Sequence, residues 1–219
     1  MANPVDYGYE EATWFAIKEF MKGNEFATAG WMGNFYSESN IVPYRLQGDF
    51  TNGFVNSHTY TNNVNNGAIK RATFMNDGKG YGLAQWTYYT RKAGMYDFWN
   101  TDEYRGGEVS IGSFNFNIAW FKRELDKDFP TIKAHMLTVT DVDSASDYVL
   151  VNYENPAGIE AAKPVRRAQS RYYYQKYTGK TPGPGPGPGP GPDPPGPDPP
   201  TPTPTKKKFK WIYYIPRRY

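Results

Sequence analysis

The first residues of the chain carry apolar side chains at the spacing of an amphipathic helix. Between residues 6 and 23 the apolar positions are three and four apart, and a glycine follows at position 23. Positions at this spacing lie on one face of a helix, and glycine commonly follows the last helical turn. The pattern predicts a first helix over residues 6–23, with an apolar face formed by Ala12, Phe15, Ala16, Phe20 and Met21.

A second helix is predicted to begin after Asn24 and to end on an acid. Asparagine is a favoured N-cap residue, because its side chain accepts a hydrogen bond from a free backbone N–H of the first turn. Trp31, Phe35 and Glu38 then follow on one face. An acid sheltered by aromatic rings holds its proton near neutral pH, since desolvation disfavours the carboxylate. Glu38, next to Phe35 and Tyr36, is therefore a candidate general acid.

The remainder of the first 180 residues contains one polar region between further helical patterns. Residues 40–80 are rich in Asn, Thr and Gly and lack helical periodicity, so we expect a polar loop or short hairpin there. Helical patterns return in four later segments, 88–99, 113–127, 141–151 and 161–177. The predicted fold class is mainly α, a helical domain in which the polar region helps to form a cleft.

The composition changes abruptly near residue 180. Residues 182–204 hold 13 of the 19 prolines, alternating with Gly, Asp and Thr. A segment without apolar side chains cannot form a core, so residues 181–205 are predicted to be a disordered linker. Extended polyproline geometry at about 3.1 Å per residue would give this linker a reach of roughly 70 Å. The predicted organisation is a domain over residues 1–180, the linker, and a tail over residues 206–219.

The positive charge of the chain belongs to its C-terminal part. Residues 181–219 carry six basic and two acidic side chains, and the whole chain has a formal net charge of +3, which leaves about −1 for residues 1–180. A basic, aromatic tail suits anionic wall polymers, lipid head groups or nucleic acid, and the alternative is a solvated end without a partner. The nearly neutral body has no nucleic-acid-binding motif, so no nucleic-acid partner is expected for it.

Several classes of chemistry are excluded by composition. The chain has no cysteine, which excludes disulfides, thiolate catalysis and cysteine metal sites. The two histidines, His58 and His135, are far apart in sequence, so neither a histidine zinc site nor a serine–histidine triad is expected. We expect no metal and no cofactor. No apolar run reaches the roughly 20 residues of a membrane span, and no secretory signal is visible at the N-terminus.

Carboxylates remain as the natural catalysts, and a second segment supplies a surface for a sugar. Residues 80–86 read Gly-Tyr-Gly-Leu-Ala-Gln-Trp, a glycine-punctuated turn that presents an amide and an indole. A protonated acid beside a hydrogen-bonding, stacking wall is what cleavage of a glycosidic bond requires. Gln85, Trp86 and Tyr81 are the candidate substrate contacts, and simple packing is the alternative for Trp86. Gly80 and Gly82 are expected to allow positive φ or close backbone approach.

The two segments together resemble the lysozyme-like muramidases. Glu38-Ser39 at the end of a helix, followed by residues 80–86, is most similar to the phage tail lysozyme domain of virion-associated peptidoglycan hydrolases. It is similar, more distantly, to the soluble lytic transglycosylases. The resemblance extends over about residues 8–177, and its further matches are residues 12–18, 32–34, 120–125, 153–157 and 167–173. It implies an α+β lysozyme-like fold and an enzyme that acts on peptidoglycan glycan strands.

The resemblance also implies roles for individual residues. Glu38 matches the catalytic acid that protonates the oxygen between N-acetylmuramic acid and N-acetylglucosamine, and Gln85 matches the cleft glutamine. Tyr153 matches a tyrosine that lines the cleft in transglycosylases, and its neighbour Glu154 is expected to be structural. The implied setting is a phage virion, in its tail or released onto the host wall, with other tail proteins as further partners. The alternative from another class is a non-catalytic wall-binding or tail structural module.

The second catalytic group is left open by the sequence. Ordinary hydrolysis requires a second carboxylate as base or nucleophile. Asp77, three residues before Gly80, is the candidate, and Asp49 is the reserve. Asp77-Gly78 also suits a tight turn, which is the favoured interpretation of that dipeptide. Without a second carboxylate the muramic acid's own hydroxyl would attack, and the enzyme would be a lytic transglycosylase that releases 1,6-anhydro products.

Overall fold

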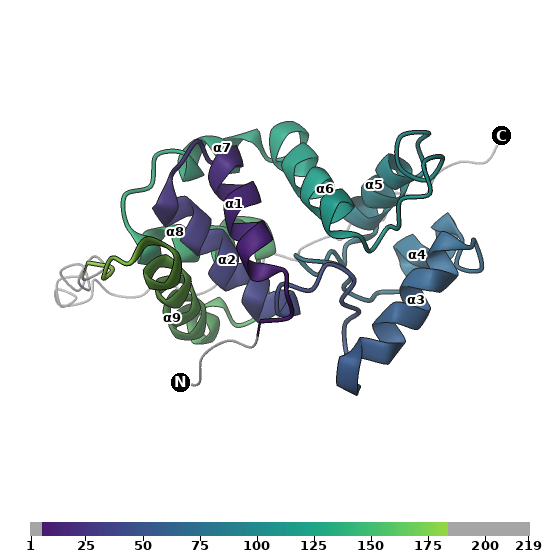
Figure 1. Ribbon diagram of the computed structural model, residues 1–219, viewed down its shortest axis with the longest axis horizontal. Helices are drawn as coiled ribbons and strands as arrows, with labels where there is room; N and C mark the ends of the chain where they lie inside the picture. The colour runs from purple at the N-terminus through teal and green to yellow at the C-terminus, as the bar shows by residue number, and fades with distance from the viewer. Residues whose placement is uncertain (1–5, 184–219) are drawn as a thin grey trace, which may run out of the picture. The chain divides into compact units, whose positions relative to one another are not determined.

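The computed structural model describes residues 6–183, and this part of the chain is mainly helical (Figure 1). Its elements are α1 (Glu10–Phe20), α2 (Glu25–Ser39), η1 (Asn52–Phe54), α3 (Val55–Asn65), α4 (Arg71–Asn76), α5 (Tyr89–Trp99), α6 (Phe114–Lys127), α7 (Pro130–Met136), α8 (Val142–Val149), η2 (Leu150–Glu154) and α9 (Ile159–Thr178). The mainly α fold class is confirmed. The predicted tail and nearly all of the predicted linker lie outside the described residues.

The first two helices lie within the predicted segments, but the buried face of α1 is formed by Thr13, Trp14 and Ile17, whereas Phe15 of the predicted apolar face is 58% exposed. Helix α1 ends at Phe20, shortly before Gly23, whose φ is +84°. Helix α2 begins at Glu25, and the Asn24 side chain caps it by accepting a hydrogen bond from the Ala27 backbone N–H at 3.1 Å. Ser113 and Asp141 cap α6 and α8 in the same manner. Caps of this type satisfy backbone N–H groups that the helix itself leaves free.

Helix α2 is the central element of the fold. Ten of its fifteen residues are buried, because α1, α8 and α9 all pack against it (Figure 1). Two glycines allow this close packing: a Cβ at Gly30 would lie 2.8 Å from Ala145 of α8, and one at Gly33 would lie 2.1 Å from the Ser170 Oγ of α9. The approach of α8 and α9 to α2 brings their polar side chains to the C-terminal half of α2.

Residues 40–80 differ from the prediction, since they contain α3 and α4 where no helix was expected. The buried positions of α3 are Ser57, Thr61 and Val64. Two of the three carry hydroxyl groups, so the sequence of α3 does not show the apolar spacing from which a helix is predicted. The Ser57 Oγ donates to the Asp49 carboxylate at 2.7 Å, and the Thr61 hydroxyl lies 2.7 Å from the Tyr81 hydroxyl. A buried hydroxyl with a partner replaces an apolar contact there. In place of the expected hairpin, Tyr81 forms isolated antiparallel bridges with Leu46 and Trp86.

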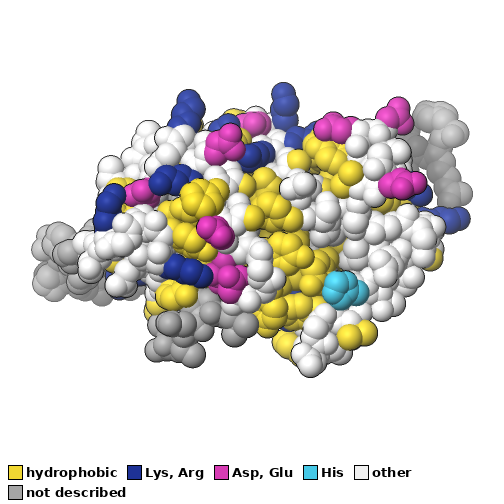
Figure 2. Space-filling model, viewed as in Figure 1, with side chains coloured by type: hydrophobic (Ala, Val, Ile, Leu, Met, Phe, Trp, Pro, Cys, Tyr) yellow, Lys and Arg dark blue, Asp and Glu magenta, His cyan; other side chains and the backbone are white. Residues whose placement is uncertain are grey.

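The later helices follow the pattern, with one addition. Helix α7 was not predicted, and it begins at Pro130, a residue that suits a first helical position because it has no N–H to leave unpaired. On the face shown in Figure 2, hydrophobic side chains form a band over the middle of the domain, and most charged side chains lie toward its edges. Among the described residues, no helix combines the length and apolar character needed to cross a bilayer.

Candidate functional site

A pocket of about 460 Å³ opens where the end of α2, the turn before α5 and the segment after α8 meet. Its walls include Glu38, Gln47, Gln85, Tyr88, Arg91 and residues 154–157. The two sequence motifs, Glu38-Ser39 and residues 80–86, therefore contribute to one site. Two carboxyl groups, those of Glu38 and Glu154, stand in its lining.

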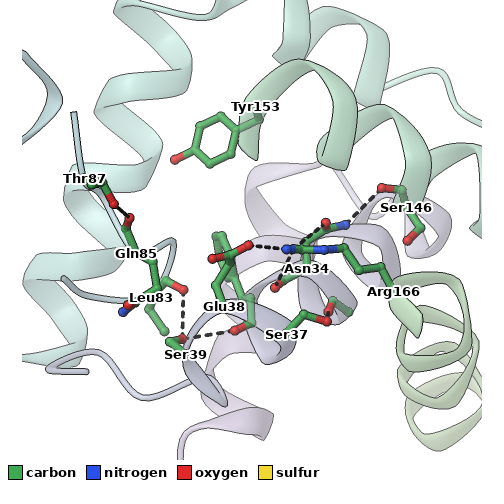
Figure 3. Close-up of polar contacts among 12 residues, drawn as sticks. Asn34, Ser37, Glu38, Ser39, Leu83, Gln85, Thr87, Ser146, Tyr153 and Arg166 are labelled. Atoms are coloured by element: carbon green, nitrogen blue, oxygen red, sulfur yellow. Dashed lines mark hydrogen bonds and ion pairs between the residues drawn. The ribbon is translucent and has the colours of Figure 1, made fainter. Parts of the chain in front are cut away.

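The Glu38 carboxylate is held by a chain of polar contacts across three helices (Figure 3). Arg166 of α9 forms an ion pair with it and also donates to the Asn34 Oδ1 at 3.0 Å. Asn34 is itself fixed, because its amide nitrogen donates to the Gly30 and Ser146 carbonyl oxygens at 2.8 and 3.0 Å. The position of Glu38 is thus set by α2, α8 and α9 together.

The ion pair has a local electrostatic reason. Glu38 lies in the last turn of α2, where the partial negative charge of the helix end disfavours another anion. Arg166, which is buried, supplies the opposite charge. The side chain of Glu38 remains 19% exposed, so its carboxyl group is accessible from the pocket.

Ser39 connects the two motifs physically. Its hydroxyl lies 3.0 Å from the Phe35 carbonyl oxygen within α2 and 2.8 Å from the Leu83 carbonyl oxygen in the glycine turn (Figure 3). Gly82 has a φ of +82°, and a Cβ there would lie 2.6 Å from the Asn117 side-chain oxygen, so both expectations for this glycine are confirmed. The turn is fixed against the end of α2 and can only form with glycine at this position.

Gln85 lies on the pocket wall in a strained backbone conformation. Its φ is +46°, in the left-handed region that residues with a Cβ seldom adopt. Its amide nitrogen donates to the Arg45 and Gly82 carbonyl oxygens, both at 3.0 Å, so the amide is anchored to the turn. Strain retained at a pocket wall is typical of functional positions.

Glu154 is the residue whose surroundings differ most from expectation. Its Oε1 is buried and has no hydrogen-bond partner among the described residues. Burial, together with the negative charge of Glu38, raises the pKa of Glu154 well above its usual value. Glu154 is thus a sheltered acid of the kind that the sequence led us to expect at Glu38, and it lines the same pocket.

The aromatic residues predicted to contact substrate are buried. Trp86 donates its indole N–H to the Glu124 carboxylate at 2.9 Å, and the Tyr153 hydroxyl donates to the same oxygen at 2.6 Å. Tyr81 pairs with the Thr61 hydroxyl in the core. Trp86, Tyr153 and Tyr81 have no exposed ring face to offer a sugar, so direct stacking on them is contradicted by their burial. The packing alternative is correct for Trp86.

Asp77 and Asp49, the residues predicted for the second carboxylate, are both engaged by other groups. Asp77 forms an ion pair at 2.5 Å with Lys92, whose side chain is fully buried, and accepts a hydrogen bond from the Lys79 backbone N–H, as in a tight turn. Asp49 accepts from the backbone and hydroxyl groups of Thr51 and Ser57, and these bonds hold its pKa far below the usual value despite its burial. Neither side chain lines the pocket.

Sequence reasoning missed Glu154 and Arg166 as parts of the site. The sequence predicts only a structural role for Glu154, because a carboxyl group beside a tyrosine carries no chemical signal of its own. Arg166 is one of several basic residues in the 161–177 segment, and nothing in its immediate neighbours separates it from the others. A helical projection of that segment places Arg166 and Ser170 on one face, and both are buried, which is the one signal available.

The site can be compared with known proteins at this point. The model of the family described as phage tail lysozyme matches residues 10–177, which is most of the chain and almost all of its described part. No curated protein and no solved structure matches the chain.

Proposed function

The chain belongs to the phage tail lysozyme family and is a peptidoglycan-degrading enzyme of phage, and we propose that it is a muramidase that uses Glu38 as the acid. In this proposal Glu38 protonates the glycosidic oxygen of the β-1,4 bond between N-acetylmuramic acid and N-acetylglucosamine. The C1–O bond then breaks and positive charge develops at C1. Glycan strands of peptidoglycan are the substrate.

One observation carries the assignment. Glu38 is a carboxyl group fixed by a buried arginine, yet it is accessible from a pocket that Gln85 also lines. An acid that serves only to cap or stabilise a helix end would not require a buried arginine that is itself held by hydrogen bonds through Asn34 to Ser146. Such positioning is what general acid catalysis needs, because proton transfer demands a fixed geometry.

The test is Glu38→Gln in the full-length protein, assayed by release of dye from labelled peptidoglycan sacculi. Loss of a general acid is expected to lower the rate by about 10²–10⁴-fold. Glu25→Gln is the matched control, because Glu25 lies at the other end of α2 and pairs with Lys18 and Lys180. A Glu38→Gln protein with full activity would contradict the assignment. An inactive parent would instead indicate a wall-binding or structural module.

A second candidate reaction is lytic transglycosylation. It is favoured by the raised pKa of Glu154, because a carboxyl group that tends to keep its proton is less able to activate water as a base. The muramic acid's own hydroxyl would attack C1 in that case. Mass spectrometry of the released muropeptides distinguishes the two: reducing ends identify hydrolysis, and 1,6-anhydro ends identify transglycosylation.

The setting that we propose is the phage virion, where the enzyme degrades the wall locally during infection. The family supports association with a tail. We also propose that the proline-rich segment 181–205 is a spacer and that the basic tail 206–219 contacts anionic wall polymers or a membrane surface, with residues 1–180 as the catalytic domain. Removal of residues 206–219 is expected to reduce binding to sacculi in a pull-down without changing cleavage of soluble glycan fragments.

A further inference from the structure

The pocket carries an exposed aromatic ring that the sequence did not bring forward as a substrate contact. The aromatic residues predicted to stack on a sugar, Trp86, Tyr81 and Tyr153, are all buried. Tyr88 lies two residues after Trp86, lines the same pocket as Glu38 and is 66% exposed. Among the described residues that line this pocket, Tyr88 is the one with an aromatic side chain.

The Tyr88 ring has no structural task within the domain. Its side chain forms no hydrogen bond, ion pair or ring contact with any residue that the structure describes. Tyr88 is the N-cap residue of α5, yet it makes no side-chain hydrogen bond to the first turn, a task for which Ser, Thr, Asp and Asn are the favoured residues. Helix α5 therefore gains no cap from this side chain.

The backbone beneath the ring is firmly held. The Tyr88 carbonyl oxygen accepts the first hydrogen bond of α5, from the Lys92 N–H at 2.9 Å. The preceding residue, Thr87, donates its hydroxyl to the Gln85 carbonyl oxygen at 2.8 Å (Figure 3). Tyr88 is thus attached both to a helix and to the turn that carries Gln85. A ring on such a base can bind a ligand without a large loss of backbone entropy.

The polar groups of the pocket wall complement an acetamido group. The Gln47 Oε1 accepts a hydrogen bond from the Gly80 backbone N–H at 2.8 Å, which leaves the Gln47 amide nitrogen as a donor without a partner among the described residues. Gln85 has the opposite arrangement, because its amide nitrogen is engaged and its Oε1 is left as an acceptor. An acetamido group has one carbonyl oxygen and one N–H to meet them.

We propose that Tyr88 is the aromatic platform of the pocket, on which one N-acetylated sugar ring of the glycan strand stacks, and that Gln47 donates to the acetamido oxygen of that ring. The inference rests on the proposed function, which supplies the substrate. A sugar ring has an apolar C–H face that suits the face of a tyrosine, whereas its hydroxyl and acetamido groups require polar partners. Tyr88 binds substrate in this scheme and takes no part in proton transfer.

The test is the kinetics of the full-length Tyr88→Ser protein on soluble glycan strands whose stem peptides have been removed. The KM is expected to rise about tenfold from the lost stacking contact, with kcat within about threefold of the parent, because a contact made equally in the ground and transition states affects KM alone. Serine can cap α5, so the midpoint of urea unfolding is expected at or above that of the parent. Tyr88→Phe keeps the ring and is expected to keep the KM.

Tyr89 provides a matched control. It is the next residue, has the same side chain and is 61% exposed, but it is absent from the pocket lining. The KM of Tyr89→Ser is expected to be that of the parent. Gln47→Glu tests the amide donor, because it keeps an oxygen for the Gly80 N–H and replaces the donor with an acceptor. Its KM is expected to rise about tenfold, since the acetamido oxygen would then face another acceptor.

Three outcomes would overturn the proposal. They are an unchanged KM in a folded Tyr88→Ser protein, an equal rise of KM in Tyr88→Ser and Tyr89→Ser, and a lower unfolding midpoint with a loss confined to kcat. An unchanged KM in Gln47→Glu would overturn the part assigned to Gln47.

A binding measurement separates this proposal from the function proposed for Glu38. Isothermal titration calorimetry with the same strands is made on Glu38→Gln and on Glu38→Gln with Tyr88→Ser. The second change is expected to raise the Kd about tenfold, the same factor as in KM. Full cleavage by Glu38→Gln would overturn the role of Glu38 and leave the result at Tyr88 standing. Equal Kd values for the two proteins would overturn the role of Tyr88 and leave that of Glu38 standing.

Discussion

Two acids near the pocket, the buried Glu124 and the partly buried Glu154, have opposite surroundings. The Glu124 side chain is 1% exposed and accepts hydrogen bonds from Arg91, Trp86 and Tyr153. Glu154 follows Tyr153 directly in sequence, yet its Oε1 has no partner. Burial raises the pKa of Glu154, whereas Glu124 is bound as a carboxylate by the Arg91 guanidinium.

The difference separates stability from function. A buried acid that accepts several hydrogen bonds fixes the elements that supply the donors, here α5, the glycine turn and η2. A buried acid left incomplete stores a proton and reduces stability, and such groups concentrate at active sites. We therefore expect Glu124 to matter for the fold and Glu154 for the chemistry, and substitutions can test both expectations.

The largest effect is expected at Glu124. Glu124→Ala leaves the Arg91 guanidinium, the Trp86 indole N–H and the Tyr153 hydroxyl buried without their acceptor. The free energy of unfolding is expected to fall by about 3–5 kcal/mol, the usual cost of removing one partner of a buried ion pair. Urea denaturation measures it. A loss below about 1 kcal/mol would show that the Glu124 contacts do not hold the fold.

A smaller loss of stability is expected at Asp77, with no loss of chemistry. Asp77→Asn removes the counter-charge of Lys92, whose side chain is fully buried, and is expected to cost about 2–3 kcal/mol, less than a fully buried pair because Asp77 is partly exposed. The rate per folded molecule on sacculi is expected to stay at the parent level. A hundredfold lower rate in a folded Asp77→Asn protein would indicate that Asp77 takes part in catalysis.

The third effect depends on pH and distinguishes Glu154 from Glu124 directly. Because its pKa is raised in the fold, the stability that Glu154 contributes is complete below its unfolded pKa of about 4.3 and is lost as pH rises toward the folded pKa. Glu154→Gln lacks this loss, so the variant is expected to gain on the parent by up to about 1.4 kcal/mol per pH unit between the two pKa values.

Urea denaturation of Glu154→Gln and the parent between pH 4 and 7 provides that measurement. The two unfolding free energies are expected to diverge as pH rises, with the variant the more stable. A constant difference across this range would mean that Glu154 titrates in the folded protein as it does in the unfolded chain.

The smallest effect is expected at Trp86. Trp86→Phe removes one donor to Glu124 and keeps most of the buried ring, which is expected to cost about 1–2 kcal/mol, the range for a hydrogen bond to a charged group. The KM for soluble glycan fragments is expected to be unchanged, because the buried ring does not face the pocket. A clear rise in KM in a folded variant would restore Trp86 as a sugar contact.

The predictions from sequence succeeded where the signal was local. Asn24 caps α2 as its side-chain chemistry requires, and the spacing of Trp31 and Phe35 correctly places the helix that ends at Ser39. Local signals failed in residues 40–80, because α3 buries Ser57 and Thr61, whose hydroxyls find partners that only the fold supplies. A buried polar residue with a distant partner has no periodic signature.

The sequence by itself determined that the chain is mainly helical and cysteine-free, and it predicted Glu38 and the glycine turn as parts of a site whose chemistry rests on carboxyl groups. Only the tertiary structure decided which other groups stand near Glu38. Glu154 lines the pocket and Arg166 pairs with Glu38 from segments more than a hundred residues away, because α8 and α9 pack closely on Gly30 and Gly33. The charge of a carboxyl group depends on burial and on neighbours that lie far from it in sequence, so the state of the acid is a property of the fold.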